Sequence, residues 1–358
     1  MIDKMVNVIS VGQCGNRIGK KFSTLGVPSC YLNSDNVDMR GLGVPEEKTF
    51  LIDGRGTGGN PRQGQRMFKG HKAEIIEFVK SQADKDKLNL VVFGLGGGTG
   101  GSIGPAILEY MINKKYKVGC LTTLPQKMLG ILAGDNALRT LKQIKDLPME
   151  LFLLADNEFL VNNVGVSNNW WEKVNEHIVG NVISAFTVLG ETKMSQTGIG
   201  SIDKGELLRI LQYGRGLTDI RTVYLTFGEL ELDKKDLKSL LFAPAFVQGF
   251  DYKETLAYLV SIDTPLQGNF TEIAKKIFDI TKNSSGSAIS RIGMFADEYL
   301  THSIRVTMIN SGMRLPKILQ SRINNLKRDE QRFVSKKEKK EDVLDSLDGG
   351  LLDEDFEL

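Results

Sequence analysis

A run of glycines between a strand and a helix constrains this chain more than any other feature of its sequence. Leu88 to Phe93 is a short apolar stretch with β-branched and aromatic residues, which favours a buried strand, and Ile103 to Ile112 has helical spacing. Between them lies Gly94 to Gly101, which is glycine almost throughout. Backbone without Cβ atoms can turn its amides toward one point, and the following helix adds its positive end. The stretch is therefore typical of a phosphate-binding loop.

Two other interpretations of this turn remain open. Glycines also permit tight packing of a strand against a helix without any ligand. In addition, Gly96 to Gly101 satisfies the dinucleotide pattern G-x-G-x-x-G, which favours an NAD-dependent oxidoreductase. Against that enzyme, the apolar run Lys117 to Thr123 lacks the acidic residue that holds a ribose, and the loop does not follow the chain's first strand. The turn is not a Walker loop, because no G-K-[ST] follows it.

Two further glycine turns lie earlier in the chain. Val6 to Val11 predicts the first strand, and it leads into Gly12-Gln13-Cys14-Gly15-Asn16 at the start of a helix. The other turn contains Gly58-Gly59-Asn60-Pro61, whose proline predicts the start of a helix over residues 62–83. In open α/β folds, loops delivered to one edge of a parallel sheet form the nucleotide site. Together the three turns predict such a site.

These loops resemble those of the tubulin/FtsZ family of filament-forming GTPases. Gly96 to Gly101 resembles the family's GGGTGG signature, Gly12 to Asn16 resembles tubulin's G-Q-C-G-N, and Gly58 to Pro61 resembles the G-G-N-P loop of FtsZ. The mixture of loops, with a long C-terminal helix, looks most like the TubZ branch encoded by plasmids and phages. The resemblance implies an α/β fold in which a Rossmann-like parallel-sheet GTPase domain is joined by a central helix to a smaller α+β domain.

The same resemblance implies which residues bind GTP or GDP with Mg²⁺. Asn33 matches the family's N-T-D loop, although it is equally a simple turn residue. Asn157 lies in a D-N-E turn like that of tubulin, and its amide suits a purine edge. Trp171 and Asn175 share a helical face and correspond to the residues that stack on guanine and read it, although a Trp at helical spacing more often packs in a core. The implied nucleotide-binding residues are Gly12, Gln13, Cys14, Gly15, Asn16, Asn33, Gly58, Gly59, Asn60, Gly96, Gly97, Gly98, Thr99, Gly100, Gly101, Asn157, Trp171 and Asn175.

Two carboxylates are the candidate catalytic residues. Asp203 and Glu206 match the family's N-x-D-x-x-D/E loop, in which Ser201 replaces the usual Asn. Considered locally, they are N-terminal caps of a helix. The resemblance implies instead that they complete the nucleotide site of the next subunit, where they orient water and help hold a hydrated Mg²⁺. We therefore expect an assembly-stimulated GTPase in which no residue is assigned as a direct metal ligand.

The loop after Thr123 departs from the family pattern. Family members place a Glu here, and FtsZ also an Arg, to hold ribose and phosphate. This chain has Leu129 or Ala133 at the Glu position, and Asp135 is a candidate substitute. How the ribose is held is therefore open.

The distribution of charged residues and the hydrophobic pattern indicate how the rest of the chain is divided into domains. Residues 341–358 carry eight carboxylates and no Lys or Arg, although the whole chain has a net charge of +2. Residues 288–295 and 303–312 predict a further strand pair. The expected divisions are a GTP-binding domain over 1–171, a central helix and connecting loop over 172–200, an α+β activation domain over 201–314, a C-terminal helix over 315–340 and an acidic flexible tail over 341–358.

The expected location is cytoplasmic and the expected partner is the protein itself. Three scattered cysteines suit reduced thiols, no apolar run is long enough to cross a bilayer, and the start carries no signal-peptide pattern. The branch implies a longitudinal homopolymer that moves or segregates plasmid or phage DNA through an adaptor at the C-terminal region, with no membrane partner. Acidic residues interrupt the basic run 327–340, so direct nucleic-acid binding is not expected. An FtsZ-like role in cell division is the alternative.

Overall fold

The computed structural model describes residues 2–164, 169–187, 194–195, 202–214, 216–268, 270–285 and 288–325. The chain divides into two units, Met1–Pro316 and Lys317–Leu358. In the second unit the described part is a helix over residues 317–325. The predictions for residues 326–358 and for Ser201 lie outside the described residues.

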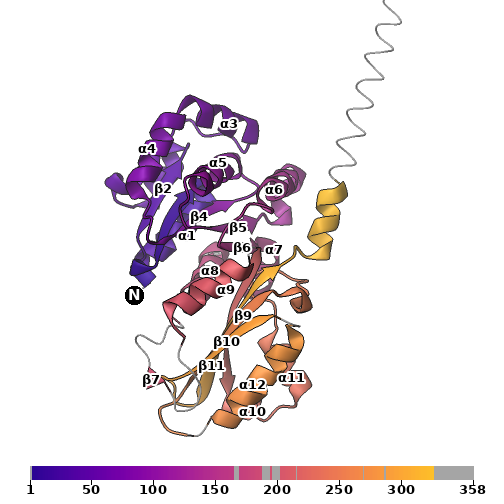
Figure 1. Cartoon of the computed structure of the whole chain (residues 1–358). Helices are drawn as coiled ribbons and strands as arrows, with labels where there is room; N and C mark the ends of the chain where they lie inside the picture. The colour runs from indigo at the N-terminus through magenta and orange to yellow at the C-terminus, as the bar shows by residue number, and fades with distance from the viewer. Residues whose placement is uncertain are drawn as a thin grey trace, which may run out of the picture. The chain divides into compact units, whose positions relative to one another are not determined.

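Parallel strands form the first half of a sheet with the order β3-β2-β1-β4-β5-β6-β8-β11-β9-β10-β7 (Figure 1). This half contains β1 (Val6–Val11), β2 (Ser29–Asn33), β3 (Thr49–Leu51), β4 (Leu88–Gly94), β5 (Val118–Leu124) and β6 (Leu151–Asp156). Neighbouring strands within it pair in parallel. Apart from the edge strand β3, they are buried along nearly all of their length, which explains their continuous apolar runs. In this order the topology switches between β1 and β4, and ligands of open α/β sheets bind at the carboxyl ends of strands at that point.

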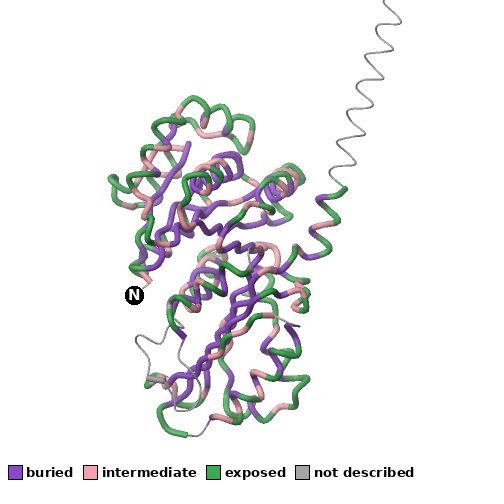
Figure 2. The backbone as a smooth tube through the Cα atoms, viewed as in Figure 1, coloured by how far each residue is buried: buried purple, intermediate pink, exposed green. Residues whose placement is uncertain are grey.

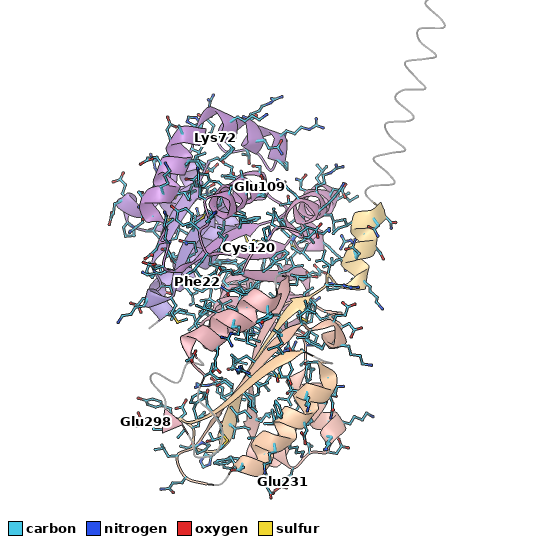
Figure 3. The ribbon with its side chains drawn as sticks, in the orientation of Figure 1. Phe22, Lys72, Glu109, Cys120, Glu231 and Glu298 are labelled. Carbon is cyan, nitrogen blue, oxygen red and sulfur yellow. The ribbon has the colours of Figure 1, made fainter. Side chains whose placement is uncertain are left out.

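Helices follow these strands in turn. They are α1 (Gly12–Thr24), α2 (Asn36–Leu42), α3 (Pro61–Gly70), α4 (Lys72–Gln82), α5 (Gly100–Asn113), α6 (Gly130–Ile144) and α7 (Asn157–Val164), with short 3₁₀ turns η1 (Ile2–Lys4), η2 (Glu46–Lys48) and η3 (Lys127–Leu129). Two of them, α1 and α5, begin close to the carboxyl ends of β1 and β4. Figure 3 shows Phe22 and Cys120 inside this half and Lys72 on its surface.

The second half of the sheet is mixed. Its strands are β7 (Met194–Ser195), β8 (Leu217–Thr226), β9 (Ala257–Thr264), β10 (Ile289–Ala296) and β11 (Ser303–Met313), and its helices are α9 (Lys204–Gly214), α10 (Phe227–Leu230), α11 (Lys234–Leu241), α12 (Thr271–Ser284) and the 3₁₀ turn η5 (Tyr252–Glu254). A bridge from Phe152 on β6 to Leu217 on β8 joins the two halves. Leu237, Ile277 and Val260 belong to a separate core of this half.

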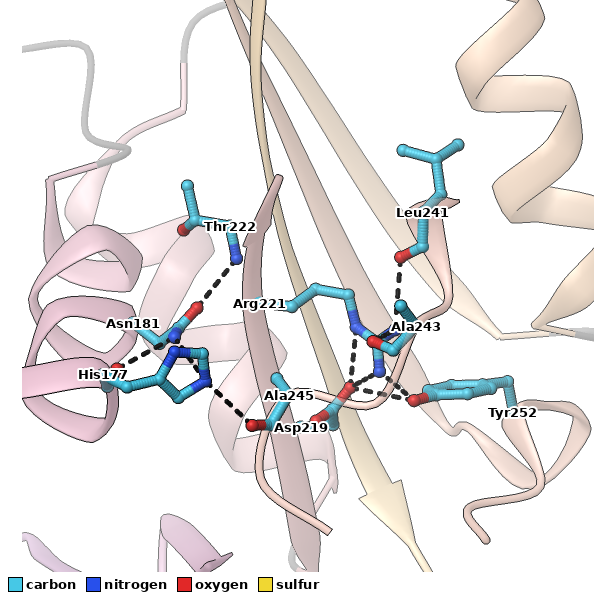
Figure 4. Close-up of polar contacts among 9 residues, drawn as sticks. All are labelled: His177, Asn181, Asp219, Arg221, Thr222, Leu241, Ala243, Ala245 and Tyr252. Carbon is cyan, nitrogen blue, oxygen red and sulfur yellow. Dashed lines mark hydrogen bonds and ion pairs between the residues drawn. The ribbon is translucent and has the colours of Figure 1, made fainter. Parts of the chain in front are cut away.

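The central helix α8 (Trp170–Phe186) packs into a core shared by both halves. Its buried residues Val174, Ile178 and Val182 contribute to a cluster that includes strand residues from each half. In Figure 2 most of the tube along the central strands of the sheet is coloured as buried. Polar contacts add to the packing, because His177 Nε2 lies 2.9 Å from the Ala245 carbonyl oxygen and the Thr222 amide donates to Asn181 Oδ1 at 2.9 Å (Figure 4).

Two predictions about these elements were wrong, one about a helix and one about strand pairing. The helix predicted over residues 62–83 is broken at His71, whose φ of −114° and ψ of 20° separate α3 from α4. The D-N-E turn after β6 forms the start of α7 at Asn157, where Asp156 Oδ1 accepts from the Glu158 amide at 3.0 Å. The strands over 288–295 and 303–312 form as β10 and β11, yet they pair with β9 and not with each other.

Candidate functional site

Loops at the carboxyl ends of the parallel strands enclose a cavity of about 500 Å³, which we call the glycine cavity. It lies where the strand order predicts a ligand, since loops after both β1 and β4 line it. The predicted residues that line it are Gly12, Gln13, Cys14, Asn33, Gly58, Gly59, Gly96, Gly97, Gly98, Thr99, Gly100 and Asn157. The three glycine turns therefore meet at one site.

Gly12 brings the first and third of these turns into direct contact. Its φ is +73°, and a Cβ added there would lie 2.9 Å from the Gly100 backbone nitrogen. Both adjoining helices start at this contact, and in the described structure neither α1 nor α5 has a side-chain cap at its first turn. Uncapped amides and two positive helix ends therefore face the same region, and this arrangement favours an anion.

Side chains fix the loops to one another around the glycine cavity. Thr99 Oγ1 lies 2.6 Å from Ser34 Oγ and 3.4 Å from Thr57 Oγ1, so hydroxyl groups connect the loops that follow β2, β3 and β4. Asn136 Nδ2 donates to the carbonyl oxygens of Gly59 at 3.2 Å and Gly96 at 3.4 Å. These contacts position the loops before any ligand binds.

A second cavity of about 490 Å³, which we call the tryptophan cavity, adjoins the first. Trp171, Asn175 and Asn16 line it, as the helical spacing of Trp171 and Asn175 predicts. Gln13 and Asp38 line both cavities, and Gln13 Nε2 donates to Asp38 Oδ1. The pair thus marks the boundary between a pocket built from glycine backbone and a pocket containing an aromatic ring.

Two asparagines at these cavities keep polar atoms without a partner. Asn16 and Asn33 are each 2% exposed, and within the part of the chain that the structure describes, Asn16 Oδ1 and Asn33 Nδ2 make no hydrogen bond. A buried polar atom without a partner is costly unless a ligand or water satisfies it. Both atoms are therefore available to a bound molecule.

Three predicted residues, Gly15, Asn60 and Gly101, are not among the described residues that line either cavity. A Cβ at Gly15 would lie 2.2 Å from the Val92 carbonyl oxygen, and one at Gly101 would lie 2.7 Å from that of Leu95, so both glycines permit close packing. The Asn60 side chain caps α3 by accepting from the Arg62 amide at 3.0 Å. Their predicted ligand contacts stay predictions.

Asp203 and Glu206 lie in the second half of the molecule, at the start of α9. They cap that helix reciprocally, since the Glu206 amide donates to Asp203 Oδ1 at 2.8 Å and the Asp203 amide lies 3.3 Å from Glu206 Oε2. Glu206 Oε1 also accepts from Arg291 Nε at 2.8 Å. Neither carboxylate is among the described residues lining the two cavities. The local interpretation as helix caps is therefore confirmed, and the catalytic role stays a prediction.

Several residues at the cavities escaped the sequence analysis. In the tryptophan cavity, the Arg17 guanidinium carbon lies 4.8 Å from the centre of the Trp171 ring, and Lys20, Lys21 and Glu172 line the same space. Leu129 and Ala133, which the sequence analysis placed at the family's Glu position, line the glycine cavity, whereas Asp135, the candidate substitute, is not among its described lining residues. Arg17 directly follows Asn16 on the first helix, and this position beside a predicted nucleotide-binding residue was the signal that could have identified it.

A parallel sheet with glycine loops at its topological switch point, beside a pocket with an indole ring, defines a nucleotide-binding α/β protein. Residues 5–165 match the family described as "Tubulin/FtsZ family, GTPase domain", and this domain of the chain belongs to the tubulin/FtsZ family. It is thus a GTPase domain, whose nucleotide is GTP or GDP with Mg²⁺ as its usual partner. The oxidoreductase interpretation of the glycine motif does not fit this domain.

Proteins similar to this chain carry several names within the family. The chain is 24% identical to the tubulin-like protein CetZ of Pyrococcus furiosus over an alignment of 370 residues, covering 97% of this chain and 96% of that protein. It is 23% identical to the cell division protein FtsZ 1 of Methanocaldococcus jannaschii over 322 residues, 86% of this chain and 83% of that protein. A GTPγS-form protofilament of TubZ from Bacillus thuringiensis serovar israelensis shares the fold, with a TM-score of 0.77 at 17% identity and 95% of each chain covered.

These similarities confirm the predicted fold and the GTPase domain. They do not single out the TubZ branch that the loops resemble, because CetZ and FtsZ proteins match by sequence and TubZ matches by fold. Among the described residues, no helix has the length and apolar character needed to span a bilayer. The cytoplasmic location stays a prediction.

Proposed function

We propose that this protein is a cytoskeletal GTPase that assembles head to tail, so that each nucleotide is enclosed between two copies. The observation that carries the proposal is the separation of the site's parts. Phosphate-binding backbone lines the glycine cavity, whereas Asp203 and Glu206 are outside the described lining of both cavities. A protein with the same fold, TubZ from Bacillus thuringiensis serovar israelensis, forms a protofilament in its GTPγS form, which supports assembly of this chain.

Within one copy, the glycine cavity holds the phosphates of the nucleotide and the tryptophan cavity holds its guanine base. The amides at the starts of α1 and α5 bind the phosphates. The Trp171 ring stacks on the guanine, and Asn175 reads its edge, since a side-chain amide offers both a donor and an acceptor. The unpartnered Asn16 Oδ1 and Asn33 Nδ2 contact the same nucleotide between these ends.

Hydrolysis requires mainly a positioned water and stabilisation of charge. The residues described as lining the glycine cavity include no Lys or Arg, so backbone amides and the metal carry that charge. Mg²⁺ would be held mainly by the phosphate oxygens of the nucleotide and by water, and it would supply positive charge beside the phosphates. Asp203 and Glu206 of the next copy orient the attacking water, and turnover therefore depends on assembly.

An Asp203→Asn substitution tests whether the Asp203 carboxylate of one copy acts on the nucleotide bound by another. Asparagine keeps the capping oxygen for the Glu206 amide but removes the negative charge, so α9 should remain folded. We expect unchanged GDP affinity and a turnover lower by on the order of 10²-fold, the scale of a positioned acid–base group. Asp233→Asn is a matched control, because Asp233 caps α11 in the same half of the molecule. Normal GTP hydrolysis by Asp203→Asn would remove Asp203 from the mechanism.

The cellular role is a finer proposal. The mixture of tubulin-like and FtsZ-like loops with a predicted long C-terminal helix supports movement of plasmid or phage DNA through an adaptor bound by the C-terminal region, and similarity to FtsZ 1 supports a division role. Expression of a fluorescent fusion in a plasmid-bearing host distinguishes them. Filaments that track plasmid foci favour segregation, and a ring at the division site favours the alternative.

A further inference from the structure

One face of α1 runs along the tryptophan cavity. The residues of this face recur at intervals of three or four and line that cavity: Gln13, Arg17, Lys20 and Thr24. Gln13 also lines the glycine cavity, whereas Arg17, one turn later, is not among the described residues of its lining. The positive charge of Arg17 therefore faces the pocket with the indole ring and not the pocket built from glycine backbone.

Two of the three cations in the tryptophan cavity already have partners. Lys20 Nζ donates to the last carbonyl oxygen of α2, and Lys21 Nζ lies 2.6 Å from Glu176 Oε1. Arg17 makes no hydrogen bond or ion pair within the part of the chain that the structure describes, and its guanidinium carbon lies 4.8 Å from the centre of the Trp171 ring. The N–H donors of Arg17 are therefore free for a bound molecule.

The contact between Arg17 and Trp171 holds a guanidinium where a base is expected to bind. A cation–π contact at an exposed site is weak, so a planar base can replace the guanidinium on the indole ring. The backbone of Arg17 stays in place, because it lies in α1 between the buried residues Asn16 and Ile18. A displaced Arg17 side chain therefore remains beside the ring and beside any base stacked on it.

We propose that Arg17 selects guanine by donating to O6 and N7 of the base. This inference rests on the proposed function, in which the base lies against Trp171. Guanine presents two acceptors on that edge, and a guanidinium is a planar fork of donors that matches them. Adenine presents N7 and an amino donor, so the fork would face a donor. Arg17 thus discriminates at a base edge next to the Watson–Crick edge, which suits the amide of Asn175.

Removing N7 from the ligand and the donors from the protein tests this contact. Arg17 is exposed, so Arg17→Met should fold normally while it loses the guanidinium. We expect wild-type protein to bind 7-deaza-GDP on the order of ten-fold more weakly than GDP in a calorimetric titration, and Arg17→Met to bind the two equally. The inference is overturned if wild type does not distinguish the two ligands, or if both proteins distinguish them to the same degree.

A matched variant and a matched ligand control this measurement. Lys21→Met changes another cation of the same helix and cavity, but one that pairs with Glu176, so it should keep the wild-type ratio of GDP to 7-deaza-GDP affinity. Inosine diphosphate keeps O6 and N7 and lacks the 2-amino group. Its affinity relative to GDP should therefore be the same in wild type and Arg17→Met, and a changed ratio would place Arg17 at another part of the base.

A conservative variant separates the shape of the guanidinium from its charge. Arg17→Lys keeps the positive charge but loses the planar fork. The preference for GDP over ADP should fall by on the order of ten-fold in both Arg17→Lys and Arg17→Met, with the lysine variant retaining more of the GDP affinity. Full wild-type preference in Arg17→Lys would show that charge alone is sufficient, which contradicts the bidentate contact.

Indole fluorescence separates this inference from the proposed function. The chain has two tryptophans, so in a Trp170→Phe protein the signal comes from Trp171 alone. GDP should quench this signal because the base stacks on the ring. Without quenching, the proposed placement of the base fails, and the role of Arg17 fails with it. Quenching by GDP together with equal binding of GDP and 7-deaza-GDP by the wild-type protein would overturn the role of Arg17 and leave the proposed function standing.

Discussion

The glycine cavity and a buried charged cluster in the second half of the molecule are built in opposite ways. In the cavity, consecutive residues after a few strands supply backbone groups. In the cluster, side chains distant in sequence meet: Asp219 and Arg221 on β8 pair with each other and with Tyr252 on η5 (Figure 4). Burial raises the pKa of Tyr252, so its hydroxyl stays protonated and donates to Asp219 Oδ2 at 3.1 Å. A site built from consecutive residues, such as the glycine cavity, can be recognised in a sequence, whereas a cluster of side chains from distant segments cannot.

The two regions are nevertheless connected. Arg221 Nη1 donates to the carbonyl oxygens of Leu241 at 3.2 Å and Ala243 at 2.5 Å, which holds the segment after α11 against β8. In that segment, the Phe246 carbonyl oxygen accepts from the Asp156 amide at 2.8 Å. Asp156 precedes Asn157, which lines the glycine cavity. The cluster thus supports one wall of the nucleotide site from a distance.

The largest expected effect is that of breaking the cluster. Arg221→Met leaves Asp219 buried without its cation, which should lower the free energy of unfolding by about 3–5 kcal/mol in a urea titration. GDP affinity should also fall, because the segment that holds Asp156 loses its anchor. Arg305→Met is the control: Arg305 pairs with Asp263 and Asp297 in the same half, so its loss should cost stability without lowering affinity. Equal affinity in both variants would disconnect the cluster from the site.

Gly12→Ala tests the backbone construction. The new Cβ would meet the Gly100 nitrogen at 2.9 Å in a left-handed conformation, so we expect GDP affinity, measured calorimetrically, to fall by on the order of 10²-fold. Gly26→Ala shares the strain, with a φ of +80°, but has open space around the added atom. It should lose stability and keep its affinity. Similar binding by the two variants would show that close approach at Gly12 is dispensable.

Trp171→Ala is expected to have a smaller effect, confined to binding. Loss of a stacking surface costs about 1–3 kcal/mol per base, which predicts a roughly ten-fold weaker GDP affinity with turnover per assembled site nearly unchanged. Trp170→Ala is the neighbouring control, because Trp170 packs against the hydrophobic core. If Trp171→Ala binds GDP as tightly as wild type, Trp171 is a packing residue.

The smallest effect concerns the thiols. Burial raises the pKa of Cys30 to about 12 and also raises the pKa values of Cys14 and Cys120. Since only the thiolate reacts, native protein at pH 8 should react with a thiol reagent more slowly than urea-unfolded protein, and faster as the pH rises. GDP should slow Cys14 further because it lines the glycine cavity. Rapid reaction of all three thiols in the GDP-bound protein would contradict this placement.

The sequence predicted those parts of the site that depend on neighbours along the chain. Glycine turns after apolar strands indicated the glycine cavity, and the spacing of Trp171 and Asn175 predicted their shared face. Features that arise between distant segments escaped it. Nothing near Arg221 in sequence points to Tyr252, and nothing in β10 or β11 shows that β9 lies between them. The break at His71 also escaped, although Gly70 directly before it is a residue that weakens helices.

Turnover per subunit as a function of protein concentration tests the central claim most directly. If the carboxylates act on the nucleotide of another copy, GTP hydrolysis per subunit should fall toward zero as the protein is diluted below its assembly concentration, while bound GTP persists. A rate per subunit that stays constant on dilution, in protein shown by sedimentation to be monomeric, would contradict the claim.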